Sequence, residues 1–382
     1  MFIPYHRPYI TDDEVNAASE TIRNGWLTMG RKTIEFEEQF GAYLEMPYSV
    51  AVNSCTAALH LALCAIGLKE GDEVIVPTTT FVSTAEVVRY FNARPVMVDV
   101  ERGTHCIDAS LIERAITPKT KAIIPVHFSG QPCDMDAIMD IARRHNLPVI
   151  EDAAHAFPAF YKGRKIGTIG DITCFSFYAT KTIAAGEGGM IVTANSRWAD
   201  KMKIMRLHGV TKDAWKRYTK EGTWEYDVLD AGFKYNTTDI CSSIAMEQMK
   251  KNDAMTDLRY AVAARYDAAF AGIDQIIPYE IKADCKSAKH LYPLRVNPAA
   301  LTITRNEFIR LLNERDIMTS VHFIPLYRFT YYRNLGYRAE DYPASEWVFE
   351  RTLSLPLYPG MTDEEVAYVI DAVSDICRVH AR

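Results

Sequence analysis

Three segments of the chain combine residue types that could do chemistry, and the first of them is Asn53-Ser-Cys-Thr56. It stands directly before an apolar helical pattern at residues 57–68. The free N–H groups of a helix N-terminus, together with serine and threonine hydroxyls, favour an anion such as a phosphate group. Because an ordinary helix cap uses the same residue types, this segment alone predicts a cap rather than a ligand site.

The second segment is an apolar strand pattern at residues 148–150 that ends in Glu151 and Asp152 and is followed by His155. In open α/β sheets, ligands bind outside the carboxyl ends of the strands. A carboxylate there could pair with a cationic ring nitrogen, and a histidine could hydrogen-bond to a ring or stack on it. Taken alone, the two carboxylates are equally typical of caps and of structural ion pairs.

The third segment places Lys181 between an aromatic run at residues 175–178 and a glycine cluster at residues 186–189. Most lysines are solvated surface charges, but a lysine in an apolar turn loses hydration, and this loss lowers its pKa. A neutral amine is what imine formation requires. Together the three segments offer what pyridoxal phosphate needs: a phosphate site, an acid that keeps the pyridine nitrogen protonated, and a Schiff-base lysine.

Alternating strand and helix patterns surround these segments and must position them. Runs rich in Val and Ile, separated by helical patterns, occur at residues 73–77, 95–100, 122–126 and 148–150. They show little polar alternation, which is typical of strands covered on both faces, and the βαβ order predicts a mostly parallel sheet. A long helical pattern follows at residues 236–270, and Thr362 with Glu365 predicts a capping box at the start of the last helix.

The fold class expected is therefore α/β with a smaller C-terminal α+β unit. We predict a large domain at residues 1–245, and connecting helices with a small domain at residues 246–382. Residues 1–20 belong to the large unit in this division, although they could pack on the small one.

Composition limits the class of protein further. With 43 Lys and Arg against 49 Asp and Glu, the net charge is −6, which disfavours a nucleic-acid partner. The longest apolar stretch, residues 57–68, is too short to span a membrane. Eight dispersed cysteines without a Cys-x-x-Cys pair indicate neither a zinc site nor a disulfide framework, so we expect a cytoplasmic protein without a bound metal. A dehydrogenase is disfavoured because Gly-x-Gly-x-x-Gly is absent.

Four of these stretches together resemble the fold-type I, pyridoxal-phosphate-dependent nucleotide-sugar aminotransferases of the DegT/DnrJ/StrS family. The stretches are Glu151–His155, Gly167–Asp171, Phe175–Lys181 and Gly186–Gly189. The similarity runs nearly end to end, from Gly25 to Pro359. It implies a large, mostly parallel α/β domain with a smaller C-terminal domain, pyridoxal phosphate (PLP, or PMP in its amine form) as cofactor, and a homodimer with a shared active site.

The resemblance also implies roles for individual residues. Lys181 matches the Schiff-base lysine, and Asp152 matches the catalytic partner of the pyridine nitrogen. His155 matches the position beside the phenolic oxygen, and Phe81 matches the aromatic that stacks on the ring. Three residues match the phosphate cup: Cys55, Thr56 and Ser176. Asn236 matches a residue that reaches the phosphate of the neighbouring subunit's cofactor.

Two departures and one agreement with the family bear on the chemistry. Cys55 stands where the family commonly has glycine, which matters little if the backbone N–H meets the phosphate. Tyr178 replaces a frequent histidine, which could change how the substrate is oriented. Relatives that carry histidine in place of the lysine are dehydratases, so the presence of Lys181 favours transamination.

The substrate is predicted from a closer resemblance to aminotransferases of UDP-4-keto sugars, carried by Gly25–Thr28, Ala122–His127, Leu207–Gly209 with Asp213–Trp215, and Tyr235–Asn236. It predicts that L-glutamate gives its amino group to a UDP- or dTDP-linked 4-keto sugar, leaving 2-oxoglutarate and a 4-amino sugar for surface-polysaccharide or related glycan biosynthesis. The alternatives are amination at C3, and a non-catalytic regulatory protein that binds the cofactor.

Residues for that substrate are less sharply indicated. The substrate-binding candidates are Trp26, Arg31, Lys32, Tyr178, His322 and Tyr327. Further candidates for neutralising a diphosphate are Arg206, His208 and Lys234. Each residue type is equally typical of an ordinary surface or packing position.

Overall fold

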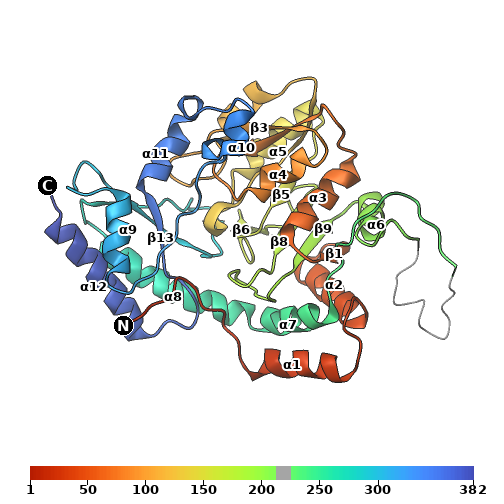
Figure 1. The fold of residues 1–382 in the computed structure, drawn as a ribbon, viewed down its shortest axis with the longest axis horizontal. Coiled ribbons are helices and arrows are strands. Elements are labelled where there is room, and N and C mark those ends of the chain that lie inside the picture. The colour runs from red at the N-terminus through yellow and green to blue at the C-terminus, as the bar shows by residue number, and fades with distance from the viewer. Residues whose placement is uncertain (212–224) are drawn as a thin grey trace.

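The computed structural model describes residues 1–211 and 225–382 (Figure 1). The Asp213–Trp215 part of the substrate resemblance lies outside the described residues. Among the helices described, none is long and apolar enough to cross a bilayer.

A twisted sheet forms the centre of the larger part of the molecule. In spatial order its strands are β3 (Arg94–Val98), β2 (Glu73–Pro77), β4 (Thr120–Ile123), β5 (Ile150–Asp152), β8 (Ile172–Ser176), β9 (Gly189–Thr193) and β1 (Tyr48–Val52). Parallel bridges from Ile123 to Val149 and from Val126 to Asp152 join the β3–β2–β4 group to the β5–β8–β9–β1 group. β9 is antiparallel to both of its neighbours, whereas β3, β2, β4, β5 and β8 are parallel.

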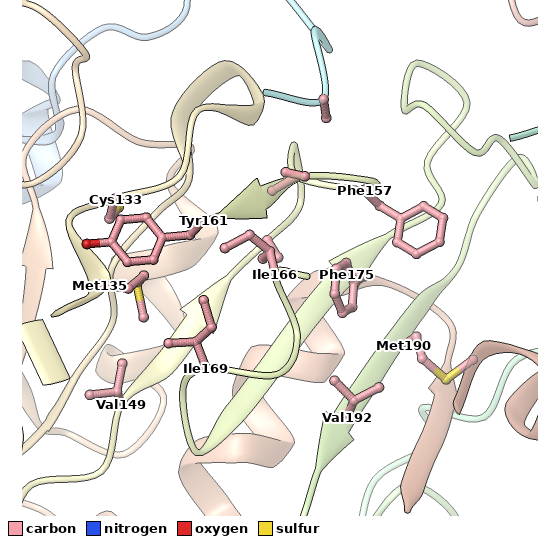
Figure 2. Close-up of a cluster of buried hydrophobic side chains, with 14 of the residues drawn as sticks. Cys133, Met135, Val149, Phe157, Tyr161, Ile166, Ile169, Phe175, Met190 and Val192 are labelled. Carbon is pink, nitrogen blue, oxygen red and sulfur yellow. The ribbon is translucent and has the colours of Figure 1, made fainter. Parts of the chain in front are cut away.

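Helices cover both faces of this sheet, as the strand composition predicts. They are α2 (Arg31–Leu44), α3 (Cys55–Ile66), α4 (Ser83–Arg89), α5 (Met135–His145) and α6 (Ser196–Met205). Along β8 the side chains alternate between two cores, since Cys174 packs with α3 on one face and Phe175 packs with Phe40 of α2 on the other. Figure 2 shows part of the second core, where Phe157, Phe175 and Met190 meet.

The C-terminal part has its own sheet and its own core. Two long helices lead into it, α7 (Asp239–Lys250) and α8 (Asn252–Phe270). The predicted domain boundary, between residues 245 and 246, falls inside α7 and stays a prediction. The antiparallel sheet consists of β10 (Ile276–Ile277), β12 (Tyr292–Val296) and β13 (Thr352–Leu355). It packs with α9 (Arg305–Asn313) and α12 (Asp363–Val379).

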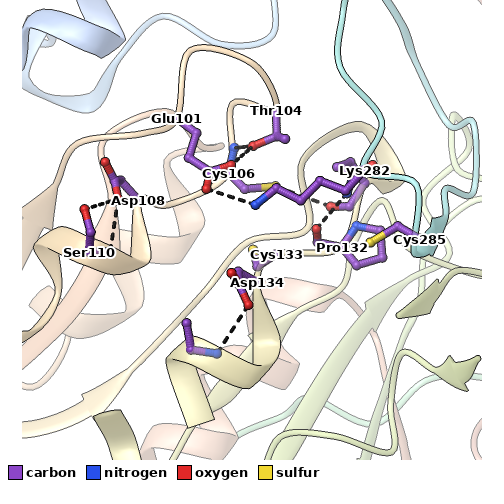
Figure 3. Close-up of polar contacts among 12 residues, drawn as sticks. Glu101, Thr104, Cys106, Asp108, Ser110, Pro132, Cys133, Asp134, Lys282 and Cys285 are labelled. Carbon is purple, nitrogen blue, oxygen red and sulfur yellow. Dashed lines mark hydrogen bonds and ion pairs between the residues drawn. The ribbon is translucent and has the colours of Figure 1, made fainter. Parts of the chain in front are cut away.

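Several contacts tie the two parts together. Lys282 forms an ion pair with Glu101 at 3.0 Å (Figure 3), and β11 (Cys285–Lys286) pairs with β6 (Phe160–Tyr161), which also pairs with β7 (Arg164–Lys165). Asp134, in the same view, caps α5 by accepting from the N–H of Ala137. Two further helices, α10 (Thr330–Asn334) and α11 (Pro343–Arg351), extend the C-terminal half over the large sheet.

The N-terminal segment begins on the C-terminal part. Ile3 forms a parallel bridge with Ile317 and belongs to the C-terminal core (Figure 1). The chain then runs to α1 (Asp12–Arg23), which packs on α7. The predicted capping box at Thr362 and Glu365 is confirmed at the start of α12.

Candidate active site

A cavity of about 470 Å³ lies at the carboxyl ends of β5 and β8, between the large sheet and the C-terminal part. Its position follows from the fold, because strands covered on both faces leave their ends as the accessible polar edge. Nine of the residues predicted from the sequence line it: Cys55, Thr56, Phe81, Asp152, His155, Ser176, Tyr178, Lys181 and His322.

One end of the cavity is the N-terminus of α3. Ser54 is the N-cap, and its Oγ accepts from the N–H of Ala57 at 3.1 Å. The first N–H groups of an α-helix have no partner within the helix, so this end favours an anion. β9 begins close by: a Cβ on Gly189 would lie 2.6 Å from the carbonyl oxygen of Ser54 and 2.8 Å from the amide nitrogen of Cys55. Glycine at position 189 therefore allows this close approach.

Asp152 ends β5, which is separated from β9 by β8 in the same sheet. Thr84 donates its hydroxyl to Oδ2 at 2.8 Å, and the N–H of Ala154 donates to Oδ1 at 3.2 Å. Burial is the main influence on this carboxyl and raises its pKa. Since no described Lys or Arg forms an ion pair with it, the carboxylate can accept a cationic ring nitrogen from within the cavity.

Lys181 lies on the turn after β8, where its N–H donates to the carbonyl of Tyr178 at 2.8 Å. Burial lowers the pKa of its ammonium to about 8, against the opposing influence of Cys55 and Asp152. Within the described part of the chain, its Nζ forms no hydrogen bond and no ion pair. The amine is therefore available for proton transfer or for bonding to a carbonyl carbon.

His155 is held in one tautomer by the backbone. Its Nδ1 accepts from the N–H of Ser129 at 3.2 Å, so a neutral ring carries its proton on Nε2. Burial, with the charge of Lys181, lowers the pKa of His155 well below its usual range. The ring stacks on Phe323 with centroids 5.7 Å apart. It can therefore donate one hydrogen bond into the cavity.

Comparison with known proteins decides what this arrangement belongs to. The model of the DegT/DnrJ/EryC1/StrS aminotransferase family matches residues 8–374. The chain belongs to that family. A Bacillus subtilis relative, the spore coat polysaccharide biosynthesis protein SpsC, is 47% identical over 99% of this chain and 97% of its own. An uncharacterized protein of Methanocaldococcus jannaschii is 50% identical over 98% and 97%.

Solved structures agree with the family. A Streptococcus pneumoniae protein assigned as a sugar aminotransferase, in its PMP form, superposes with a TM-score of 0.93 at 36% identity, covering 99% of both chains. Helicobacter pylori PseC, an aminotransferase of pseudoaminic acid biosynthesis, gives 0.92 at 26% identity, covering 99% of this chain and 100% of its own. The predicted family, fold class and pyridoxal-phosphate-dependent aminotransferase activity are therefore confirmed.

In this aminotransferase the cavity has a wall that the sequence analysis missed. Tyr5 and His6 reach it from the N-terminal segment, and His290 reaches it from the stretch before β12. The rings of Tyr5 and His322 stack at 5.6 Å, and those of His155 and His290 lie 4.5 Å apart. No local signal marks these residues, because pairing between chain segments far apart in the sequence brings them to the site.

Eight residues predicted for the site of the aminotransferase do not line the cavity of their own chain: Trp26, Arg31, Lys32, Arg206, His208, Lys234, Asn236 and Tyr327. Trp26 donates its indole N–H to the carbonyl of Met29, and Arg31 and Lys32 both contact Glu35. Asn236 accepts from Lys234 at 2.7 Å.

Tyr327 and Arg206 are buried instead. Tyr327 is 1% exposed and stacks on Tyr342 with centroids 4.9 Å apart, so it packs in the core with α3. Arg206 is 2% exposed, and its Nη1 contacts Glu37 and the carbonyl of Ala51. Neither side chain is available to a substrate in this cavity.

Proposed function

We propose that this aminotransferase transfers the amino group of L-glutamate to a UDP- or dTDP-linked 4-keto sugar, releasing 2-oxoglutarate. The observation that carries the proposal is Lys181, a buried amine of lowered pKa that shares one cavity with Asp152 and the start of α3. The sugar is supported by relatives named for spore coat polysaccharide and pseudoaminic acid biosynthesis. The 4-amino sugar would serve a surface polysaccharide or a related glycan.

The residues of the cavity fit the cofactor at four points. The start of α3, with Cys55, Thr56 and Ser176 beside it, would hold the phosphate. Asp152 would hold the ring nitrogen, because it is a buried carboxylate whose hydrogen bonds come from neutral groups. His155 would donate its Nε2–H to the phenolic oxygen. Phe81 would stack on the ring from the cavity mouth, where its side chain is exposed.

When bound, the cofactor supplies an electron sink that stabilises negative charge on the substrate carbon that carries the amino nitrogen. Neutral Lys181 would remove a proton at Nζ from the α-carbon of glutamate and pass it to the cofactor. In the second half-reaction Nζ would take a proton back from the cofactor and deliver it to the sugar carbon that receives the nitrogen. Asp152 stays ionised at the ring nitrogen and keeps it protonated. The apolar rings of Phe81 and Phe323 limit the access of water.

We expect the enzyme to work as a homodimer in the cytoplasm. Phe81 and Tyr178 are about half exposed at the mouth of the cavity, where a second subunit would cover them. Asn236 would then act at the neighbouring subunit's phosphate site, which suits its position away from the cavity of its own chain. A cytoplasmic location is supported by eight free cysteines.

The decisive experiment is to incubate the enzyme and glutamate with a panel of 4-keto and 3-keto nucleotide sugars and to identify the aminated carbon by NMR. The proposal expects 4-amino products, with Lys181→Ala giving none. Amination at C3 would replace the C4 assignment by the alternative within the family. If simple keto acids accept the amine and no keto sugar does, the proposed substrate class is wrong.

A further inference from the structure

Arg259, on α8, is a buried cation without a carboxylate partner. Its side chain is 2% exposed, and no described Asp or Glu forms an ion pair with it. Its Nη1 donates to the carbonyl of Leu357 at 3.3 Å, and its Nε has no partner among the described residues. Burial lowers the pKa of the guanidinium to about 10, so it stays charged at neutral pH. A buried charge left unpaired is costly, so an anion is expected to approach it.

Two other buried arginines form no ion pair with a described residue, and they differ from Arg259 in one respect. Arg295 lies 5.8 Å from the ring centroids of both Tyr279 and Trp347, and Arg305 lies 4.9 Å from that of Phe349. Such cation–π contacts offset part of the cost of burying a guanidinium. Within the described residues, Arg259 has no ring of this kind beneath it. Its charge is therefore less well compensated by the protein than theirs.

Arg259 lies directly behind one wall of the active-site cavity. Leu357, whose carbonyl accepts its hydrogen bond, lines the cavity. Tyr5, His6 and His290 line the same wall, and the charge of Arg259 acts on all three. Nδ1 of His290 and Nε2 of His6 are buried without a hydrogen-bond partner among the described residues. The wall thus presents unused polar atoms with a positive charge behind them.

The histidines of this wall do not supply a positive charge themselves. Burial lowers the pKa of His6 to about 4 and that of His322 to about 3, and it lowers the pKa of His290 well below its usual range. Among the described residues, no arginine lines the cavity, and the one lysine that does, Lys181, is the proton-transfer group. Within the described part of the chain, Arg259 is therefore the fixed cation that remains for an anionic group bound at this wall.

We propose that Arg259 is a positioning residue that holds a carboxylate of the amino donor against the wall formed by Tyr5, His6 and His290. The carboxylate is favoured over a sugar diphosphate because the donor's α-carboxylate is bonded to the carbon that loses the amine. It must therefore lie near Lys181, whereas the diphosphate is several bonds from the keto carbon. This inference rests on the proposed function in taking glutamate as the donor.

The first test measures binding of glutarate, an unreactive dicarboxylate, to the holoenzyme. Arg259→Gln keeps an N–H for the carbonyl of Leu357 and removes the charge, and it should weaken glutarate binding about 10- to 100-fold. Arg259→Lys keeps the charge and should lose much less. Arg305→Gln is the matched control, a buried arginine over Phe349 that should leave the glutarate Kd unchanged. An unchanged Kd in a folded Arg259→Gln protein would overturn the proposal.

The second test separates positioning from a structural role by following each half-reaction in the cofactor absorbance. Arg259→Gln should raise the glutamate concentration needed for half-maximal rate and leave the keto-sugar half-reaction unchanged. Equal losses in both half-reactions would assign Arg259 a structural role, and weaker UDP binding with unchanged glutarate binding would assign it to the nucleotide. Either result overturns the proposal.

A folding failure of Arg259→Gln and a failure of the proposed function have different consequences for the role of Arg259. If Arg259→Gln does not fold, the Lys variant decides, because weak glutarate binding by a folded protein that retains the charge contradicts the inference. If the unaltered enzyme binds glutarate and reacts with glutamate but aminates no keto sugar, the proposed function fails while the role of Arg259 stands.

Discussion

Lys181 and Asp152 are both buried, and burial shifts their pKa values in opposite directions. The pKa of Lys181 falls to about 8 and that of Asp152 rises, so each shift favours the uncharged form. Neither residue gains a full ion pair in compensation among the described residues. Such costs are typical of functional sites rather than of structural ones. The lowered pKa of Lys181 supplies the neutral amine that proton transfer requires, whereas Asp152 needs the cationic ring that we propose it binds to become ionised.

The pKa of Lys181 leads to a pH prediction. Nζ must be neutral to accept a proton, so the single-turnover rate of the amine-loaded enzyme with the keto sugar should rise with pH and level off above about 8. Stopped-flow absorbance across about pH 6 to 9 measures this profile. Lys181→Ala serves as the control and should remove the rising limb together with nearly all of the rate. A flat profile in the unaltered enzyme would contradict the assigned role.

The close contact between β9 and α3 shapes the end of the cavity that we propose for the cofactor phosphate. Ser54 is the last residue between β1 and α3 and is the N-cap of α3. Gly189 is the first residue of β9 and lies against the backbone of Ser54 and Cys55. The ladder between β8 and β9 pairs Gly189 with Ser176, so three separate segments meet at one point. The helix terminus becomes an anion site only because the neighbouring strand leaves room for it.

Gly189→Ala tests this arrangement. A methyl group there would lie 2.6 Å from the backbone of Ser54, which forces β9 and α3 apart. We expect the affinity for pyridoxal phosphate to fall about tenfold or more, since charge-assisted hydrogen bonds to the phosphate are misaligned. Cofactor titration followed by protein fluorescence measures this Kd. Gly360→Ala is the control, because its methyl group would meet only the Tyr9 ring, at 3.9 Å. Equal affinities in both variants would argue against the contact.

The whole molecule consists of two packed parts whose boundary contains the active site. The N-terminal segment is bound to the C-terminal part through Ile3 and Ile317, and it carries Tyr5 and His6 into the cavity wall. Two other residues lie away from this wall. Asn236 is outside the cavity, and the exposed ring of Tyr178 is at the open mouth of the cavity. These two positions are the ones that a partner subunit would use or cover.

Subunit complementation tests the shared site. Lys181→Ala should inactivate its own site, and Asn236→Asp should inactivate the site of its neighbour by repelling the phosphate. Mixed dimers then contain one site with both residues intact, so refolding equal amounts together should restore about a quarter of the unaltered activity. Each variant alone is the control. If the mixture stays inactive although mixed dimers form, Asn236 does not act across the interface.

The buried histidines predict how the folded chain responds to acid. Burial lowers the pKa of six of the ten: His6, His60, His105, His155, His290 and His322. Below about pH 6.5 the unfolded chain binds protons that the folded chain does not, so stability is full above that pH and falls towards pH 4. Urea unfolding of the cofactor-free protein at several pH values measures the loss. His60→Gln should reduce this loss of unfolding free energy by up to about 3 kcal/mol, because folding lowers the pKa of His60 to about 4. An unchanged slope in that variant would contradict the prediction.

Local order along the chain is enough to predict part of the candidate site. Lys181, Asp152 and His155 each stand at the end of an apolar strand pattern, and Thr56 stands at a helix start, so alternation of strands and helices brings them to one sheet edge. Which distant segments complete that edge depends instead on how the whole chain packs. Tyr5 and His290 carry no local signal, because their places depend on contacts across hundreds of residues.

The same reason explains why the sequence did not indicate the surroundings of two other residues. Tyr327 is of a residue type that often lines pockets, yet its ring stacks on Tyr342 and is buried in the core with α3. In the sequence, Arg259 is indistinguishable from any other charged residue of a helix. It is buried behind the cavity wall because α8 packs against Leu357. Residue type and spacing specify what chemistry a side chain can do, whereas burial and unsatisfied partners, which decide whether it does so, are properties of the packed chain.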